Sequence, residues 1–200
     1  MSAKILVFAG SVRAGSFNVI LANTLTNALT EMGADAEHLS LADYDMPIFN
    51  ADIEIPESVK ALALRMSYCD GMVIVSPEYN SSIPPLLKNA LDWVSITQSD
   101  ATTGFGPYAG KVCFLAAASP GGLGGIRSLY HLRAVLMNVG AEILTKQLAL
   151  GNAGAAFDSE GNILDERARD IMKTGLTDLL NTIASTKTIA SAGNMKGRDA

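Results

Sequence analysis

Three short stretches of this sequence are apolar apart from one polar residue at an end, and each of them runs into turn-forming residues. They are Lys4–Ala9, Met72–Ser76 and Lys111–Ala118. A strand with one face in water alternates apolar and polar residues, so an uninterrupted apolar stretch predicts a strand covered on both faces. Strands of this kind are typical of parallel sheets that lie between two layers of helices. This feature limits the chain to a layered α/β fold.

Segments with helical spacing of their apolar residues separate these strands. They are a helix from an N-capping Ser16 to Gly33, and further helices over Glu57–Tyr68, from Pro84-Pro85 onward, over Ile126–Asn138 and over Leu164–Ile183. Two further strands are expected over Ala36–Leu41 and Ala141–Leu150. Five strands alternating with helices predict a flavodoxin-like three-layer sandwich, with a five-stranded parallel sheet in the order 2-1-3-4-5.

The length of 200 residues, 48% of them hydrophobic, suits a single domain with a full core. We expect that domain to span residues 1–184, with an irregular loop from Asp43 to Pro56. The segment 185–200 is rich in Ser, Thr, Gly and Lys without periodicity, and this composition predicts a flexible tail.

Charge and composition exclude several classes of partner. The net charge of -5 and the pI near 5.0 argue against nucleic acid and anionic membranes, which require clustered cationic surface. No apolar run approaches the length that spans a bilayer, and the first run is too short for a signal peptide, so a cytoplasmic protein is expected. Cys69 and Cys113 are interpreted as small buried hydrophobic residues, and no metal site is expected.

Ligands of open α/β sheets lie beyond the carboxyl ends of the strands, and the first such end carries the features of a phosphate cradle. Ser11, Ser16 and Asn18 offer donors, Arg13 offers a positive charge, and a helix begins near Phe17. The loop has neither the G-K-[ST] of a nucleoside triphosphate site nor G-x-G-x-x-G, so it suits a terminal monophosphate. The alternative is an ordinary strand–helix turn with a capping serine.

Two other strand ends could enclose a flat group. Tyr79 can lie along a ring system, Asn80 can reach a heteroatom, and Gly121 and Gly122 would let the backbone approach a ring edge. The alternatives are an exposed loop tyrosine and a flexible glycine turn. A monophosphate cradle beside a slot for a planar ring predicts a site for flavin mononucleotide (FMN).

Two motifs carry a family resemblance. G-S-x-R-x-x-S-x-N at residues 10–18 and P-E-Y-N-x-S-x-P-x-x-L-K-N-A-x-D-W at residues 77–93 resemble the NADPH-dependent FMN reductase family, including its chromate/quinone reductases and azoreductases. The likeness extends from Lys4 to about Leu150. It implies an FMN phosphate held by Ser11, Arg13, Ser16, Phe17 and Asn18, an isoalloxazine lined by Pro77, Glu78, Tyr79 and Asn80, and ring or ribityl contacts from Ser119, Gly121 and Gly122.

The same resemblance implies an oligomer. Family members commonly pack a dimer interface at the position of Asp92-Trp93, so a homodimer is expected. In the chromate/quinone reductase branch, residues at the positions of Arg127 and Tyr130 join two dimers, which makes a homotetramer possible. That branch pairs its arginine with a glutamate, whereas this chain has Gln147 at the position that aligns with it.

The expected activity is a ping-pong transfer of hydride from NADPH or NADH to FMN and then to a quinone, flavin, azo, nitro or metal-oxyanion acceptor. No catalytic side chain is assigned, since FMN carries the chemistry. Glu78 is expected to support its loop, and His131 to have an interface or surface role rather than to donate a proton. The alternative is a flavodoxin-like electron carrier or an FMN sensor, neither of which would turn over NAD(P)H.

Overall fold

The computed structural model describes residues 2–97 and 106–196, with side chains through Ile189. Its sheet has five parallel strands in the order β2-β1-β3-β4-β5, which confirms the predicted topology. Val7 of β1 lies opposite Val73 of β3, which in turn lies opposite Phe114 of β4. The strands are β1 Lys4–Ala9, β2 Asp35–Leu39, β3 Gly71–Val75, β4 Val112–Ala118 and β5 Glu142–Leu150.

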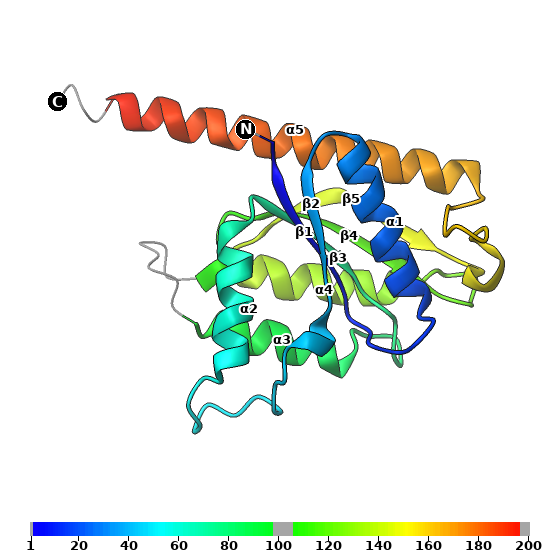
Figure 1. The fold of residues 1–200 in the computed structure, drawn as a ribbon, viewed down its shortest axis with the longest axis horizontal. Coiled ribbons are helices and arrows are strands. Elements are labelled where there is room, and N and C mark those ends of the chain that lie inside the picture. Colours follow the sequence, from blue (N-terminus) through cyan, green and yellow to red (C-terminus); the bar gives the residue numbers. More distant parts are fainter. Residues whose placement is uncertain (1, 98–105, 197–200) are drawn as a thin grey trace.

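Helices cover both faces of this sheet, as the apolar strands predict. On one side lie α1 and α5, and on the other lie α2, α3 and α4 (Figure 1). Their bounds are α1 Phe17–Glu31, α2 Glu57–Tyr68, α3 Pro85–Ser95, α4 Ile126–Asn138 and α5 Glu166–Lys196, with short 3₁₀ turns at Leu41–Asp43 (η1), Gly106–Tyr108 (η2) and Ala153–Ala155 (η3). The chain is therefore the expected three-layer sandwich.

The position of each strand in the sheet explains its sequence. Every residue of β3 and β4 is buried, because these strands lie inside the sheet and have helices on both faces. Fully burying one aliphatic side chain contributes about 1.5–3 kcal/mol, so these two strands hold much of the core. At the edge, β5 is less buried, and its pairing with β4 shifts register between Cys113 and Leu115.

Two boundaries differ from the sequence-based ones. The predicted strand Ala36–Leu41 ends at Leu39, because the Ser40 hydroxyl accepts a hydrogen bond from the Ala42 amide and starts the 3₁₀ turn η1. The last helix begins at Glu166, and it continues to Lys196 instead of stopping at Ile183.

The residues after 184 are therefore helical up to Lys196, not irregular, and α5 projects past the sheet (Figure 1). The Lys187 ammonium lies 2.6 Å from the Asp70 carboxylate, and the Thr186 hydroxyl donates to the Thr182 carbonyl at 3.0 Å. The Lys187–Asp70 pair ties this part of the helix to the residue before β3, although its sequence lacks an apolar stripe. The domain limit at 184 stays a prediction, and residues 197–200 lie outside the described part.

The segment between η1 and α2 has no regular structure, as expected, but α3 holds it in place. The Trp93 indole nitrogen donates to the Pro47 carbonyl at 2.7 Å, and the Asn89 side-chain oxygen accepts from the Phe49 amide at 2.7 Å. Phe49 packs edge-on against Trp93, with the ring centroids 5.1 Å apart. The loop is thus fastened to α3, the helix that follows the P-E-Y-N motif.

No helix in the described part of the chain is both long enough and apolar enough to cross a membrane.

Both cysteines are buried, which confirms their interpretation as core residues. Burial raises the pKa of the Cys69 thiol to about 11 and that of Cys113 further still. Because the thiolate is the reactive form, we expect iodoacetamide at pH 8 to leave both thiols unmodified in the folded protein and to modify both in urea. Mass spectrometry after timed quenching checks this, and rapid labelling of the native protein would contradict it.

Candidate active site

Three loops begin side by side at the carboxyl edge of the sheet. We call residues 10–16 the first loop, 76–84 the second loop and 119–125 the third loop. Each loop extends the sheet by one backbone hydrogen bond beyond the end of its strand. The amides of Gly10, Ser76 and Ser119 donate to carbonyls of the neighbouring strand at 2.8, 2.8 and 3.0 Å. The loops therefore follow the adjacent strands β1, β3 and β4, as the sheet order predicts.

The first loop presents donors that no protein group uses. Ser16 is the N-cap residue of α1, but its hydroxyl makes no capping bond. Within the described residues, the amides of Phe17 and Asn18 also have no hydrogen-bond acceptor. Three donors at the positive end of a helix suit an anionic group.

Arg13 and Gly15 shape this loop. Gly15 has a φ of +66°, a conformation that favours glycine. The Arg13 guanidinium curls over the loop and donates to the carbonyls of Ala14 and Gly15, each at a long 3.4 Å. The cation is thus exposed beside the cradle and only weakly bound by it.

Asn18 has a different role from the one its sequence position suggests. Its side-chain nitrogen donates to the Ala118 carbonyl at 2.8 Å, and its oxygen accepts from the Ala118 amide at 2.9 Å. The buried carboxamide therefore links the start of α1 to the end of β4. Its backbone amide, rather than its side chain, is the clearer donor for an anion.

The second loop contains a tight turn in an unusual conformation. Tyr79 and Ser82 exchange two backbone hydrogen bonds of 3.0 Å, and the residues between them, Asn80 and Ser81, have φ values of 49° and 66°. Two consecutive positive φ angles define a type I′ turn, which is costly for a non-glycine residue such as serine. The turn leaves the Tyr79 side chain 48% exposed at the edge of the sheet, where it can stack on a flat group.

An ion pair between the second loop and α4 holds this turn. The Glu78 carboxylate accepts from Nε of Arg127 at 2.7 Å and from the Arg127 amide at 3.1 Å. The Glu78 side chain is only 8% exposed, and α4 has no capping side chain of its own, since Gly125 is its N-cap. Glu78 thus serves as an external cap of α4.

The electrostatics of Glu78 follow from these contacts. Burial raises the pKa of the Glu78 carboxyl, but the guanidinium of Arg127 and the amides of Arg127 and Ser128 lower it by more, so its pKa lies below the ordinary value. Glu78 is therefore ionised at neutral pH and acts as a fixed acceptor. This arrangement fits the expected supporting role.

Two further side chains of α4 hold the second loop, and sequence reasoning missed both. The Ser128 hydroxyl lies 2.6 Å from that of Ser76 and donates to the Pro77 carbonyl at 2.9 Å. His131 Nδ1 lies 2.9 Å from the Ser82 hydroxyl. The only sequence signal is that residues 127, 128 and 131 share one face of a helix.

The glycines of the third loop fall into two pairs with different surroundings. A Cβ on Gly122 would meet nothing within 4 Å, and one on Gly121 would meet only the Ser119 hydroxyl at 3.8 Å. At Gly124, with φ +63°, a Cβ would lie 2.5 Å from the Ala149 carbonyl carbon, and at Gly125 it would lie 2.8 Å from the Ala117 Cβ. Gly124 and Gly125 thus allow close packing within the chain, whereas Gly121 and Gly122 are open to a ligand.

The remaining predicted residues also lie at these loops. Ser11 and Ser119 lie within two residues of the ends of β1 and β4, and their hydroxyls accept from the amides of Arg13 and Gly121 at 3.4 and 3.3 Å. Pro77 is buried, and Phe17 starts α1 and packs against the core on that side of the sheet. The predicted residues are therefore distributed over three adjacent loops.

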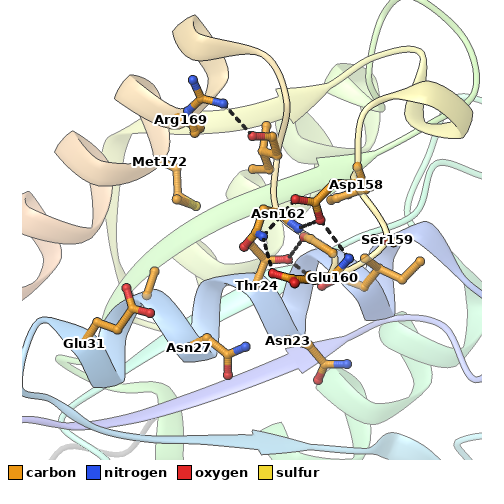
Figure 2. A pocket seen from close by; sticks show the side chains of 15 residues that line it. Asn23, Thr24, Asn27, Glu31, Asp158, Ser159, Glu160, Asn162, Arg169 and Met172 are labelled. Atoms are coloured by element: carbon orange, nitrogen blue, oxygen red, sulfur yellow. Dashed lines mark hydrogen bonds between the residues drawn. The ribbon is translucent and has the colours of Figure 1, made fainter.

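Away from the three loops, a hollow lies between α1, the start of α5 and residues 157–163 (Figure 2). It measures about 390 Å³. The Asp158 carboxylate there accepts from the Asn162 amide at 2.8 Å, and Thr24 donates to the Gly161 carbonyl at 2.7 Å. These polar groups close their own turn and anchor it to α1, so we do not assign the chemistry to this hollow.

The chain is similar to known flavin-dependent oxidoreductases in sequence and in fold. The family model described as NADPH-dependent FMN reductase matches residues 3–155. A quinone reductase of Escherichia coli K12 is 35% identical over 181 residues, covering 87% of this chain and 92% of that protein. An NAD(P)H-dependent FMN reductase of Pseudomonas aeruginosa is 32% identical over 181 residues, with 88% and 92% covered. The flavoenzyme NAD(P)H:(acceptor) oxidoreductase FerB of Paracoccus denitrificans superposes with a TM-score of 0.77 at 27% identity, over 92% of this chain and 98% of that one.

Proposed function

The chain belongs to the NADPH-dependent FMN reductase family, and we propose from this premise that it reduces quinones at an FMN bound by the three loops. Its activity is that of an NAD(P)H-dependent flavin oxidoreductase, and not that of an electron carrier. The proposed acceptor class rests on the E. coli relative, whose name is quinone reductase and which the chain matches over nearly its whole length.

The proposal rests on the hydrogen-bond donors at the start of α1 that have no acceptor among the described residues. The Ser16 hydroxyl and the amides of Phe17 and Asn18 would bind the FMN phosphate, with Arg13 and Ser11 beside them. A terminal monophosphate matches this cradle in charge and in its need for hydrogen-bond donors.

The second and third loops would hold the ring. Tyr79 would lie against the isoalloxazine, and the backbone of Pro77 to Asn80 would bind its polar edge. Ser119, Gly121 and Gly122 would approach from the other loop, and the space beside Gly122 supports such a contact. The α4 contacts to Glu78 would keep the turn in place whether or not a ligand is bound.

The chain's own contribution is binding and orientation. Bound FMN would supply the redox chemistry, namely acceptance of hydride from NAD(P)H and delivery of the reducing equivalents to the second substrate. The protein would fix the phosphate, hold the ring edge with backbone groups and leave one face of the ring accessible to both substrates in turn. No side chain is assigned as a general acid in this scheme.

A homodimer in the cytoplasm is the proposed form of the enzyme. Exposed apolar residues lie on α4 and in the loop before it: Tyr130 and Met137 are seven positions apart on one side of the helix, and Leu123 precedes it. A tetramer that uses Arg127 and Tyr130 would differ from its family counterpart. Here Glu78 pairs with Arg127 within the chain, and Gln147 accepts from Arg133 at 2.9 Å.

Anaerobic reduction tests the function. We expect the purified protein with FMN to lose its flavin absorbance within seconds of adding NADPH or NADH, and to regain it when benzoquinone is added. Free FMN at the same concentration serves as the control, because it reacts slowly. Tight FMN that neither nucleotide reduces would overturn the reductase proposal, and failure of benzoquinone alone would overturn the acceptor class.

A further inference from the structure

A second pocket of about 210 Å³ lies on the other side of the first loop, away from the second and third loops. The first loop, the first turn of α1 and the end of β2 enclose it. Because β2 and β3 flank β1 on opposite sides, this pocket and the ring-binding loops are separated by the first loop. It is therefore distinct from the slot proposed for the flavin ring.

The polar side chains that line this pocket are Ser11, Arg13, His38 and Ser40, and none of the described residues lining it is acidic. This is notable in a chain with a net charge of -5. Strand alternation explains it, because Glu37 points to the opposite face of the sheet, where it pairs with Arg65. The pocket thus gathers a cation and three other potential donors.

His38 has no hydrogen-bond partner among the described residues, although it is half-buried. Burial lowers the pKa of its imidazole, so the ring is neutral at pH 7 and carries one N–H donor. The two bonds of the Arg13 guanidinium are long and use only part of its five N–H groups. A phosphate would satisfy both side chains at once.

We propose that this pocket binds the 2′-phosphate of NADPH, and that His38 and Arg13 thereby give NADPH preference over NADH. The inference rests on the proposed function, in which the single phosphate of FMN already occupies the start of α1. NADPH differs from NADH only by its 2′-phosphate, and this group would need a binding site separate from that of the FMN phosphate. In Rossmann dinucleotide sites, by analogy, an acidic residue about 20 positions after the glycine-rich turn binds the ribose 2′-OH of NAD, or a nearby arginine accommodates the 2′-phosphate of NADP.

The distances along the sheet allow this arrangement. A nicotinamide stacked on a ring beside the ends of β3 and β4 lies two to three strand spacings from the end of β2, about 10–15 Å. An extended dinucleotide spans such a distance along the carboxyl edge. The hydride donor would then cross above the first loop, and Arg13 would lie between the two phosphates.

His38→Glu tests the proposal, because a carboxylate in this pocket would repel a phosphate while leaving NADH unaffected. We expect the wild-type enzyme to favour NADPH. In the variant, kcat/KM for NADPH should fall about tenfold or more through KM, with kcat/KM for NADH within about twofold and the Kd of FMN unchanged. His38→Gln, which keeps a donor, should retain most of the preference. Asn23→Glu adds the same charge on an exposed face of α1 and controls for net charge.

A binding measurement separates this inference from the proposed function. Calorimetry should show that adenosine 2′,5′-bisphosphate binds the wild-type protein more tightly than 5′-AMP, and that His38→Glu removes the difference. Equal losses for both hydride donors, or no loss for NADPH, would overturn the inference. A rise in the Kd of FMN would identify the pocket as the FMN phosphate site instead. If the wild type oxidises neither nucleotide, the proposed function fails, while the bisphosphate titration still decides what the pocket binds.

Discussion

Replacing Gly124 by alanine is expected to lower the free energy of unfolding by about 2–5 kcal/mol, even without FMN. The residue has a φ of +63°, where an L side chain costs about 1–2 kcal/mol. The added Cβ would also lie 2.5 Å from the Ala149 carbonyl carbon and 2.8 Å from the Gly151 amide nitrogen. Both neighbours are backbone atoms of β5 and its extension, so the third loop must move away from the sheet. Urea unfolding of the apoprotein, followed by circular dichroism, measures this loss.

Gly122→Ala is the matched control in the same loop. A Cβ there meets nothing within 4 Å, so we expect the free energy of unfolding to change by less than about 0.5 kcal/mol. If the flavin ring lies against Gly122, however, the same methyl group should weaken FMN binding. Equal destabilisation by the two variants would contradict the packing argument, and unchanged FMN affinity in Gly122→Ala would remove Gly122 from the proposed site.

The fold could be predicted because the pattern that indicates it is contained within single short stretches of the sequence. The uninterrupted apolar residues of β1, β3 and β4 indicate burial on both faces, and a parallel sheet is the architecture that supplies it. The end of α5 was not predictable in the same way. Its last turns lack an apolar stripe, and they are extended by a distant partner, as the pairing of Lys187 with Asp70 shows. Such contacts leave no periodicity in the sequence.

The site was predictable as a set of loops but not as a set of contacts. Motif residues at three strand ends converge because parallel strands end at one edge. Asn18 was expected to present its side chain to a phosphate, yet that side chain binds Ala118, one hundred positions away. Gly121 and Gly122 resemble Gly124 and Gly125 in the sequence, and only the packing of the third loop on β5 and β4 separates their roles.

The support of the second loop by α4 is the least visible part of the site. The family resemblance assigns Ser128 and His131 no contact with the second loop, and their significance comes from lying one turn apart on the face of α4 that touches the loop. A turn with two positive φ angles on non-glycine residues persists only when its surroundings hold it. In the proposed site, this helix would therefore contribute to cofactor binding without contacting the cofactor.

The second large effect is expected from breaking the Glu78–Arg127 pair. Glu78→Gln keeps the shape of the side chain but removes the charge that caps α4 and pairs with Arg127. We expect the Kd of FMN to rise about tenfold and the free energy of unfolding to fall by about 1–3 kcal/mol, with the rate of hydride transfer in the FMN-saturated enzyme little changed. Flavin fluorescence titration and stopped-flow absorbance measure the two effects separately. Tight FMN combined with lost hydride transfer would show that Glu78 acts in the chemistry.

A double-mutant cycle of Glu78→Gln and Arg127→Gln measures the interaction between the two side chains separately from what each contributes alone. The double variant should lose less free energy of unfolding than the two single variants combined, by about 0.5–3 kcal/mol, because each single change leaves the other partner unpaired. Additive effects would mean that the pair does not hold the loop.

The pH dependence follows from the lowered pKa of Glu78. Since its folded-state pKa lies below the unfolded value near 4.5, the charged side chain stabilises the fold at pH values above 4.5. This contribution decreases as the pH falls through the folded pKa, where the carboxyl group is protonated in both states. The difference in unfolding free energy between the wild type and Glu78→Gln should therefore be constant from about pH 8 to 5.5 and shrink below about pH 4.5. A difference that grows on acidification would contradict the direction of the pKa shift and, with it, the assignment of Glu78 as the ionised anchor of the second loop.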